Sequence, residues 1–162
     1  MRDYEECRPY IAHLLAEHRR LHTMLGQARA SIVQSGGPDR DASVADVVRV
    51  LAHIRSELAH HFAEEEGGGC LDEAVCRCPR LSADARRIEA EHPELLHEID
   101  LLIARAKDSE QSVTERLSLE RDFEHLSRQL CAHEAAENAI LRQAFGTNVN
   151  GEEIGRPAIH DF

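Results

Sequence analysis

The sequence predicts an all-α protein, an up-down-up-down antiparallel four-helix bundle with a short C-terminal extension. Four long segments carry apolar residues at alternating steps of three and four, the period of an amphipathic helix, and no strand-like alternation appears. Glycine and proline breaks separate the segments, and the first two connections are short, which favours antiparallel neighbours. The length of 162 residues suits one domain. We expect the bundle to occupy residues 1–146 and a weakly ordered polar tail to occupy residues 147–162.

The first two predicted helices form one hairpin. The first runs from about Pro9 to about Ser35, where a Gly-Gly-Pro sequence ends it. The second opens at Ser43, with Asp46 three residues on in a capping-box-like start, and ends before three consecutive glycines. Their apolar stripes are Ile11, Leu14, His18, Leu21, Leu25, Ala28 and Ile32 in the first helix, and Val47, Val50, Ile54, Leu58, His61 and Glu65 in the second.

The last two predicted helices form a second hairpin. The third opens near Ser82, and the fourth opens near Ser112, with Glu115 as its capping-box partner, and ends at Gly146. We expect the segment from Cys70 to Leu81 to be a connection that adds a short helical turn. The stripes are Ile88, His92, Leu95, Ile99, Leu102 and Ala106 in the third helix, and Leu119, Phe123, Leu126, Leu130, His133, Glu137, Ile140 and Ala144 in the fourth.

Each predicted helix places one histidine on its apolar stripe, and two helices add a glutamate one turn later. The four histidines are His18, His61, His92 and His133, and the two glutamates are Glu65 and Glu137. Residues four apart share a helix face, so each His-x-x-x-Glu pair can point at one place. Buried carboxylates are rarely tolerated unless they are paired or bind a metal, and no lysine or arginine lies on these stripes.

A cationic centre would balance these two buried charges, which neutral imidazoles cannot do. Four imidazoles and two carboxylates suit a pair of non-haem iron ions, with zinc or manganese as possible substitutes. Two bridging carboxylates would hold two metals about 3.5–4 Å apart. The sequence therefore predicts a metal site formed by His18, His61, Glu65, His92, His133 and Glu137.

Composition limits the other partners. A formal net charge of −11 argues against nucleic acid or an anionic membrane surface as the main partner. The apolar runs are too short to cross a bilayer, and no signal sequence is apparent. Five cysteines, an odd number, do not suggest a disulfide framework, so we expect a reducing, cytoplasmic location.

The chain resembles the hemerythrin-like, HHE-type cation-binding domains over about residues 8–146. The matching motifs are Glu17-His18, His61-Phe62-Ala63-Glu64-Glu65, Glu91-His92 and His133-Glu134-Ala135-Ala136-Glu137. The resemblance implies a di-iron centre, with an oxo or hydroxo bridge, in which both glutamates bridge the irons. It also implies a protein that binds or senses dioxygen or another small diatomic ligand, or that handles iron under oxidative or nitrosative stress.

The sequence departs from the invertebrate oxygen-carrying hemerythrins, which have a fifth histidine one turn after that of the third helix. Here that position is Leu96. Those proteins also have an aspartate five residues after the histidine of the fourth helix, where this chain has Glu137 at four. The chain is more similar to bacterial hemerythrin-like proteins and to those linked with repair of iron–sulfur clusters. His22 and His97 are candidates for a fifth ligand or for a partner of a ligand.

Two other functions compete with this prediction. A ferritin-like di-iron oxidase or iron-storage protein would use Glu-x-x-His pairs, here Glu57 with His60 and Glu94 with His97, but both pairs fall off the stripes. A metal-free interaction bundle is the third possibility.

Two local features stay open from the sequence. Pro93 either begins a helix or distorts one beside His92. Cys70, Cys76 and Cys78 suggest a loop with reactive thiols more than a zinc site, because no fourth ligand has suitable spacing.

Overall fold

The structure is a computed structural model that describes residues 4–34, 44–108 and 113–146. Within these ranges it contains no strand, and the predicted all-α class is confirmed. The helices, in chain order, are α1 (Tyr4–Gln34), α2 (Val44–Glu66), α3 (Cys70–Arg77), the 3-10 turn η1 (Pro79–Leu81), α4 (Ser82–Asp108) and α5 (Val113–Phe145). The predicted caps Ser43 and Ser112 and the tail 147–162 lie outside the described residues.

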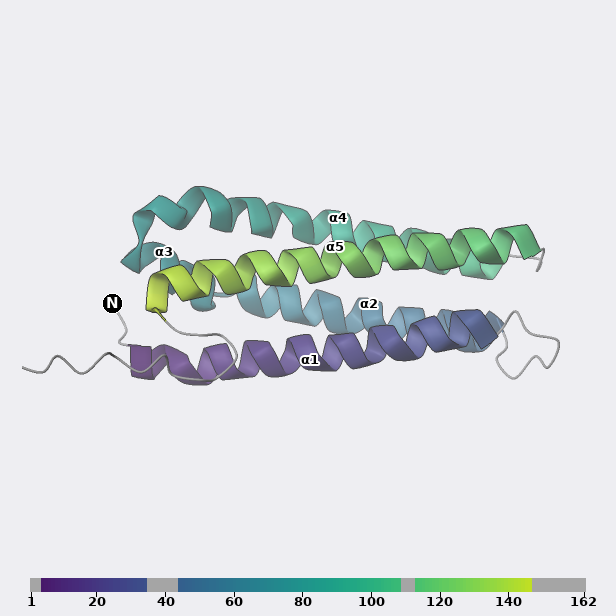
Figure 1. The fold of residues 1–162 in the computed structure, drawn as a ribbon, viewed down its shortest axis with the longest axis horizontal. Coiled ribbons are helices and arrows are strands. Elements are labelled where there is room, and N and C mark those ends of the chain that lie inside the picture. Colours follow the sequence, from purple (N-terminus) through teal and green to yellow (C-terminus); the bar gives the residue numbers. More distant parts are fainter. Residues whose placement is uncertain (1–3, 35–43, 109–112, 147–162) are drawn as a thin grey trace, which may run out of the picture.

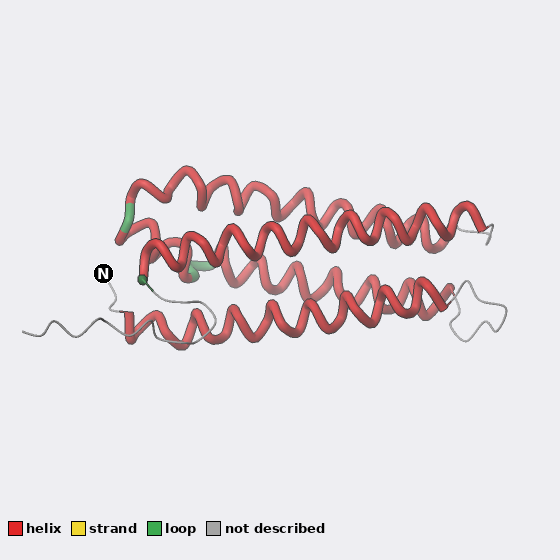
Figure 2. Tube along the Cα trace, viewed as in Figure 1, coloured by secondary structure: helices red, strands yellow, loops and turns green. Residues whose placement is uncertain are grey.

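The four long helices lie side by side (Figure 1). The starts of α1 and α4 lie at the same end of the molecule as the ends of α2 and α5. Helix α1 packs against α2 and α5, and α4 packs against the same two helices. The tube view shows that the loops within the described chain are short and gather at the end that holds α3 (Figure 2).

Helix α1 begins before the predicted start at Pro9, which lies inside it. A proline removes one backbone hydrogen bond, and close to a helix start this loss costs little. Cys7 is buried and belongs to the same apolar cluster as Ile11 and Leu14, so the first turns bury a face of their own. This packing explains why the helix extends beyond the proline signal.

A glycine turn ends α2 directly after its acidic residues. The amide of Gly67 donates to the carbonyl of Ala63 at 3.1 Å, and that of Gly69 donates to the carbonyl of Glu65 at 3.2 Å. Gly68 has a φ of +98°, a conformation that glycine adopts at little cost. The turn therefore holds the last turn of α2, including Glu65, in a defined position.

The segment after this turn is more regular than predicted. The sequence suggested a connection with a short helical turn, and the structure has the eight-residue helix α3 followed by η1. The reason is an apolar face: Leu71, Ala74 and Leu81 are buried in the cluster that α1, α4 and α5 also form. This segment covers one end of the bundle (Figure 1).

The apolar interior consists of two clusters. The larger contains residues of α1, α2, α4 and α5, from Leu21 to Ile32, Val47 to Phe62, Leu95 to Ala106 and Leu119 to Leu130. The smaller contains Cys7, Ile11 and Leu14 with residues of α3, η1, α4 and the end of α5. On α1, α4 and α5 the stripe histidine falls between the two clusters, so a polar layer separates them.

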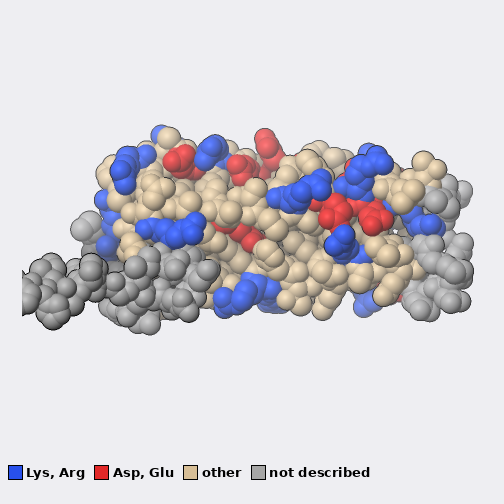
Figure 3. Space-filling model, viewed as in Figure 1, with Lys and Arg blue, Asp and Glu red and all other residues tan. Residues whose placement is uncertain are grey.

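The surface carries both signs of charge. Figure 3 shows basic and acidic side chains interspersed on the viewed face. Ion pairs connect neighbouring helices, including Arg29 with Glu124 at 2.6 Å and Arg105 with Asp122. None of the described helices combines the length and apolar character that a bilayer span requires.

Candidate metal centre

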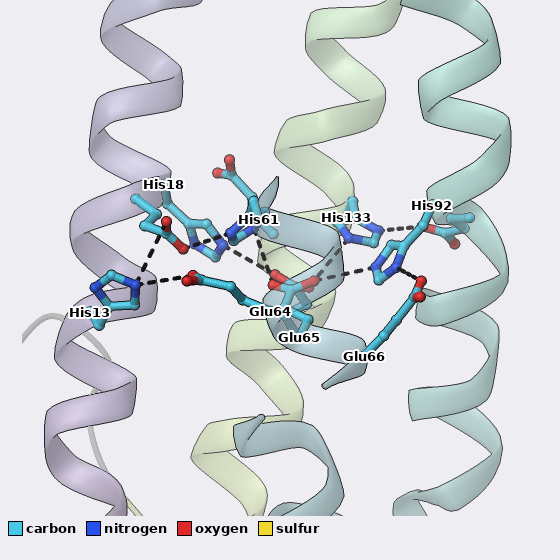
Figure 4. A network of polar contacts seen from close by, with 12 residues as sticks. His13, His18, His61, Glu64, Glu65, Glu66, His92 and His133 are labelled. Carbon is cyan, nitrogen blue, oxygen red and sulfur yellow. Dashed lines mark hydrogen bonds and ion pairs between the residues drawn. The ribbon is translucent and has the colours of Figure 1, made fainter. Parts of the chain in front are cut away.

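The four stripe histidines and both stripe glutamates are buried in one polar layer across the bundle. Figure 4 shows the four histidines and Glu65 in this layer. His18 comes from α1, His61 and Glu65 from α2, His92 from α4, and His133 and Glu137 from α5. Glu137 is fully buried at 0% exposure, and Glu65 is 8% exposed. The predicted helix phase therefore brings these six side chains together.

Each glutamate lies between two imidazoles. The Nε2 atoms of His61 and His92 lie 3.1 and 3.3 Å from the two different carboxylate oxygens of Glu65. The Nε2 atoms of His18 and His133 likewise lie 3.2 and 3.3 Å from the two oxygens of Glu137. One oxygen of each carboxylate thus faces one half of the layer, and the other oxygen faces the other half.

These atoms form two potential metal sites that share both glutamates. In one site His18 and His61 join Glu65 and Glu137, and in the other His92 and His133 join the same two glutamates. The ligand atoms within each site lie within 4.8 Å of one another. Each helical hairpin supplies both histidines of one site, and each site takes one glutamate from the other hairpin.

The donor atoms lack hydrogen bonds of their own. The buried side-chain atoms without a hydrogen-bond partner include Nε2 of all four histidines and all four carboxylate oxygens of Glu65 and Glu137. Leaving a buried polar group unsatisfied costs about 1–3 kcal/mol, and more if it is charged. Eight such atoms converging in one layer fit metal ions, which accept imidazole nitrogen and carboxylate oxygen together. The residues present therefore fit the metal that the sequence predicted.

Without a metal, protons would balance part of the charge. Burial lowers the pKa of His133, but the carboxylates of Glu137, Glu91 and Glu65 together raise it to about 9. Burial raises the pKa of Glu137, but the His133 and His18 imidazoles lower it overall. For Glu65 burial dominates, and its pKa is raised in spite of His92. A metal must therefore displace protons from this site, as is general for imidazole ligands.

Three of the four histidines have a carboxylate at their second ring nitrogen. His61 Nδ1 lies 3.0 Å from Glu17, His92 Nδ1 lies 2.8 Å from Glu66, and His133 Nδ1 lies 2.9 Å from Glu91. An ionised carboxylate can only accept a hydrogen bond, so Nδ1 carries the proton and the Nε2 lone pair is left for the cluster. Such partners orient imidazole ligands and raise their basicity.

His18 is the exception, because its Nδ1 has no hydrogen-bond partner among the described residues. The two hairpins show where the pattern breaks. Glu66 follows Glu65 in the first hairpin, and Asn138 follows Glu137 in the second, so an amide replaces the carboxylate. His18 consequently lacks the Nδ1 partner that the other three imidazoles have.

Phe62 packs inside the layer. Its ring stacks on that of His92 with centroids 4.1 Å apart and planes 2° apart, and it meets His133 edge-on at 5.5 Å. Phe62 is 3% exposed. It therefore fixes two imidazoles on one side of the layer and helps to exclude water there.

The structure brings neither candidate fifth histidine into these sites. His22 lies 2.5 Å from the Glu134 carboxylate, and its side chain is 49% exposed. His97 is exposed and belongs to no group of metal-ligating side chains among the described residues. His22 is thus a partner of Glu134, the residue that follows His133, and lies outside both groups of ligand atoms.

The ferritin-type pairs also stay outside. Glu57 pairs with Arg20 at 3.0 Å, and the side chain of His60 is 67% exposed. Glu94 and His97 are exposed on α4. A site built from Glu-x-x-His pairs is therefore absent from the described part of the chain.

Pro93 lies inside a helix. Helix α4 begins at Ser82 and continues through Pro93, so the interpretation that a helix begins at the proline is wrong.

The three clustered cysteines belong to a helix, where the sequence suggested a loop. Cys70 and Cys76 lie in α3, and Cys78 is its C-cap residue. In the described ranges, no group of three potential metal ligands includes a cysteine.

Sequence reasoning missed the carboxylates around the histidines. Glu64 and Glu66 are both exposed, and each still contacts a histidine: Glu66 contacts His92 at 2.8 Å, and Glu64 contacts His13 at 3.1 Å. A signal for part of this set was present: a Glu-His dipeptide occurs at Glu17-His18 and again at Glu91-His92. In each case the glutamate reaches the histidine of the next long helix.

An all-helical chain with a buried layer of imidazoles and shared carboxylates belongs to the class of metal-binding helical bundles. Residues 10–144 match the hemerythrin HHE cation-binding domain, and the chain belongs to this family. The family resemblance inferred from the sequence is thus confirmed. No curated protein and no solved structure matches the chain.

Proposed function

We propose that this protein holds a non-haem di-iron centre and uses it to bind or sense dioxygen or a related diatomic molecule, or to handle iron under oxidative or nitrosative stress. The observation that carries the proposal is the sharing of Glu65 and Glu137 by two sites, with the oxygens of each glutamate divided between them. We also propose an up-down-up-down order for the helices, which the alternating ends in Figure 1 support.

The ligands would be His18, His61, Glu65 and Glu137 at one metal, and His92, His133, Glu65 and Glu137 at the other. Together they offer eight donor atoms, whereas two six-coordinate ions need about twelve. A bridging oxygen would fill about two positions and leave others open. When bound, such an iron pair supplies open coordination positions and exchangeable electrons to a diatomic ligand.

The chain's own residues define the setting. Glu17, Glu66 and Glu91 hold protons at Nδ1 of three imidazoles, and Phe62 and the apolar clusters on both sides limit water. Zinc or manganese also suits this donor set. We place the protein in the cytoplasm, because five cysteines in a chain of this kind suit a reducing compartment.

Reconstitution with ferrous iron under nitrogen, followed by elemental analysis, tests the centre. We expect about two irons per chain, with optical spectra that change when dioxygen or nitric oxide is added. Retention of no iron, or of a single iron, would contradict a di-iron centre. Two bound irons with spectra insensitive to both gases would retain the centre and overturn its role toward diatomic ligands.

A further inference from the structure

In addition to the two inner sites, a separate group of potential metal ligands lies on the outer side of the layer. It contains His13 and Glu17 of α1 and Glu64 of α2, whose ligand atoms lie within 4.8 Å of one another. His13 Nε2 is 3.1 Å from Glu64 Oε2 and 3.7 Å from Glu17 Oε1. The side chains are 60%, 42% and 19% exposed for His13, Glu64 and Glu17, so the group is open to solvent. Figure 4 shows His13 and Glu64 directed toward each other beside the buried layer.

This group lies at a cavity that extends to the buried layer. The cavity is lined by His13, Glu17 and Glu64, and also by Glu65, Gly69 and Cys70. Its volume of about 40 Å³ accommodates roughly three water molecules. The carboxylate oxygens of Glu65 are buried and face His61 and His92 in the inner sites. The open group and a residue of the inner sites therefore line one cavity.

Glu17 connects the two directly. Its Oε1 faces His13, while its Oε2 lies 3.0 Å from Nδ1 of the inner histidine His61. In the described part of the chain, Glu17 and Glu64 form their ion pairs with histidines alone. These two carboxylates thus have no lysine or arginine partner among the described residues, and their negative charge attracts a cation.

The two helical hairpins repeat the pattern of inner ligands, but only the first hairpin carries this outer group among the described residues. Arg87 stands four residues before Glu91, where the first hairpin has His13 four residues before Glu17. Ala136 stands before Glu137, where the first hairpin has Glu64 before Glu65. The second hairpin therefore keeps the inner ligands and lacks the outer group.

We propose that His13, Glu17 and Glu64 form a third, solvent-exposed site for a divalent transition metal, which delivers the ion through the shared cavity to the inner centre. One imidazole and two carboxylates suit ferrous iron and manganese. The delivery role rests on the proposed di-iron centre, whereas the outer site does not. An experiment can therefore reject the outer site without rejecting the di-iron centre, and the reverse.

The first measurement uses the iron-loaded protein, whose inner sites are filled, with Mn²⁺ as the probe. Bound Mn²⁺ is counted from the loss of the free-ion electron paramagnetic resonance signal. We expect one additional Mn²⁺ per chain, lost in both His13→Gln and Glu64→Gln. The matched control is His53→Gln, which alters an exposed histidine four residues before Glu57 and should keep the additional ion. No additional ion, or an ion retained in both variants, overturns the proposal.

The second measurement follows delivery. Metal-free protein is mixed rapidly with Co²⁺, and the growth of its visible absorption is recorded. We expect both outer variants to load the inner sites several-fold more slowly than wild type and the His53 variant. Equal loading rates overturn delivery. A protein that takes up no metal at the inner sites contradicts the proposed function instead.

Discussion

Glu91 Oε2 lies 2.9 Å from His133 Nδ1, and this contact joins α4 to α5 beside the buried layer. Glu17 and His61 repeat the relationship between α1 and α2 at 3.0 Å. In both pairs the glutamate precedes one stripe histidine in sequence and holds the next one in space. The Glu-His dipeptide thus supplies a ligand with its second residue and positions a different ligand with its first.

Glu91→Gln should lower metal affinity without removing a ligand. The amide cannot enforce a proton at Nδ1 of His133 as an ionised carboxylate does, and loss of such a partner typically costs 10–100-fold in affinity. Competition with a chelator of known affinity measures the effect. Glu57→Gln is the control, since Glu57 pairs with Arg20 and touches none of the inner histidines. Equal affinities for the two variants would show that Glu91 positions nothing.

His61→Ala and His60→Ala should differ sharply, although the residues are adjacent. The side chain of His61 is 3% exposed and faces Glu65, whereas that of His60 is 67% exposed. Removing His61 leaves Glu65 buried beside a missing partner, at a cost of about 3–5 kcal/mol. Removing His60 should cost under about 0.5 kcal/mol and retain both metals. Urea unfolding and metal analysis measure both quantities, and the reverse result would mean that the helix phase is wrong.

Metal removal should destabilise the bundle, because a ligand that binds only the folded state stabilises it by mass action. At a free metal concentration 100 times the Kd this amounts to about 2.7 kcal/mol. For a chain of this size the melting temperature should fall by ~5–10 °C. Calorimetry of the stripped and reloaded protein measures the shift. Superimposable melting curves would mean that the metal is not coupled to folding.

The metal-free protein should lose stability between pH 6.5 and about 9. The pKa of His133 is raised from 6.5 to about 9 in the folded chain, so protonation stabilises the fold fully below pH 6.5 and this contribution disappears as the pH rises through about 9. The lowered pKa of Glu137 acts at the other side, and its contribution is lost as the pH falls below 4.5. Urea midpoints at pH 6 and pH 9.5 test this.

The metal-loaded protein is the control for this pH dependence. A bound metal takes the place of the proton on His133, so its midpoint should not fall over the same interval. If the loaded and stripped forms respond alike, the titrating group lies elsewhere.

The helices and six inner residues could be predicted because both depend on local periodicity. A histidine in phase with Leu58 or Leu95 must face the interior of whichever bundle forms. The surrounding carboxylates could not be predicted in this way. Glu17 and Glu91 lie off the apolar stripes, and the histidine that each reaches depends on how neighbouring helices are rotated and staggered. Glu66 lies at a helix end, where a solvated side chain is the usual outcome.

The connection after α2 escaped prediction for a different reason. Cys70 to Leu81 is too short to show a clear period, and its cysteines and Pro79 suggested an irregular loop. Its helical form depends on an apolar surface offered by α1, α4 and α5, to which Leu71, Ala74 and Leu81 contribute. Tertiary packing decides whether such a short segment is helical, and the sequence of the segment alone does not reveal that packing.

The polar layer between the two apolar clusters has a consequence for cooperativity. Each cluster is stabilised by the burial of many apolar side chains, whereas the layer between them is mostly polar, with Phe62 as the apolar side chain stacked among its imidazoles. The two sites that share Glu65 and Glu137 draw on all four long helices at this point. Bound metal would therefore make both halves unfold as one unit. In the stripped form the half that contains α3 would open on its own, and its amide hydrogens would exchange by a sub-global route while those of the larger half stay protected.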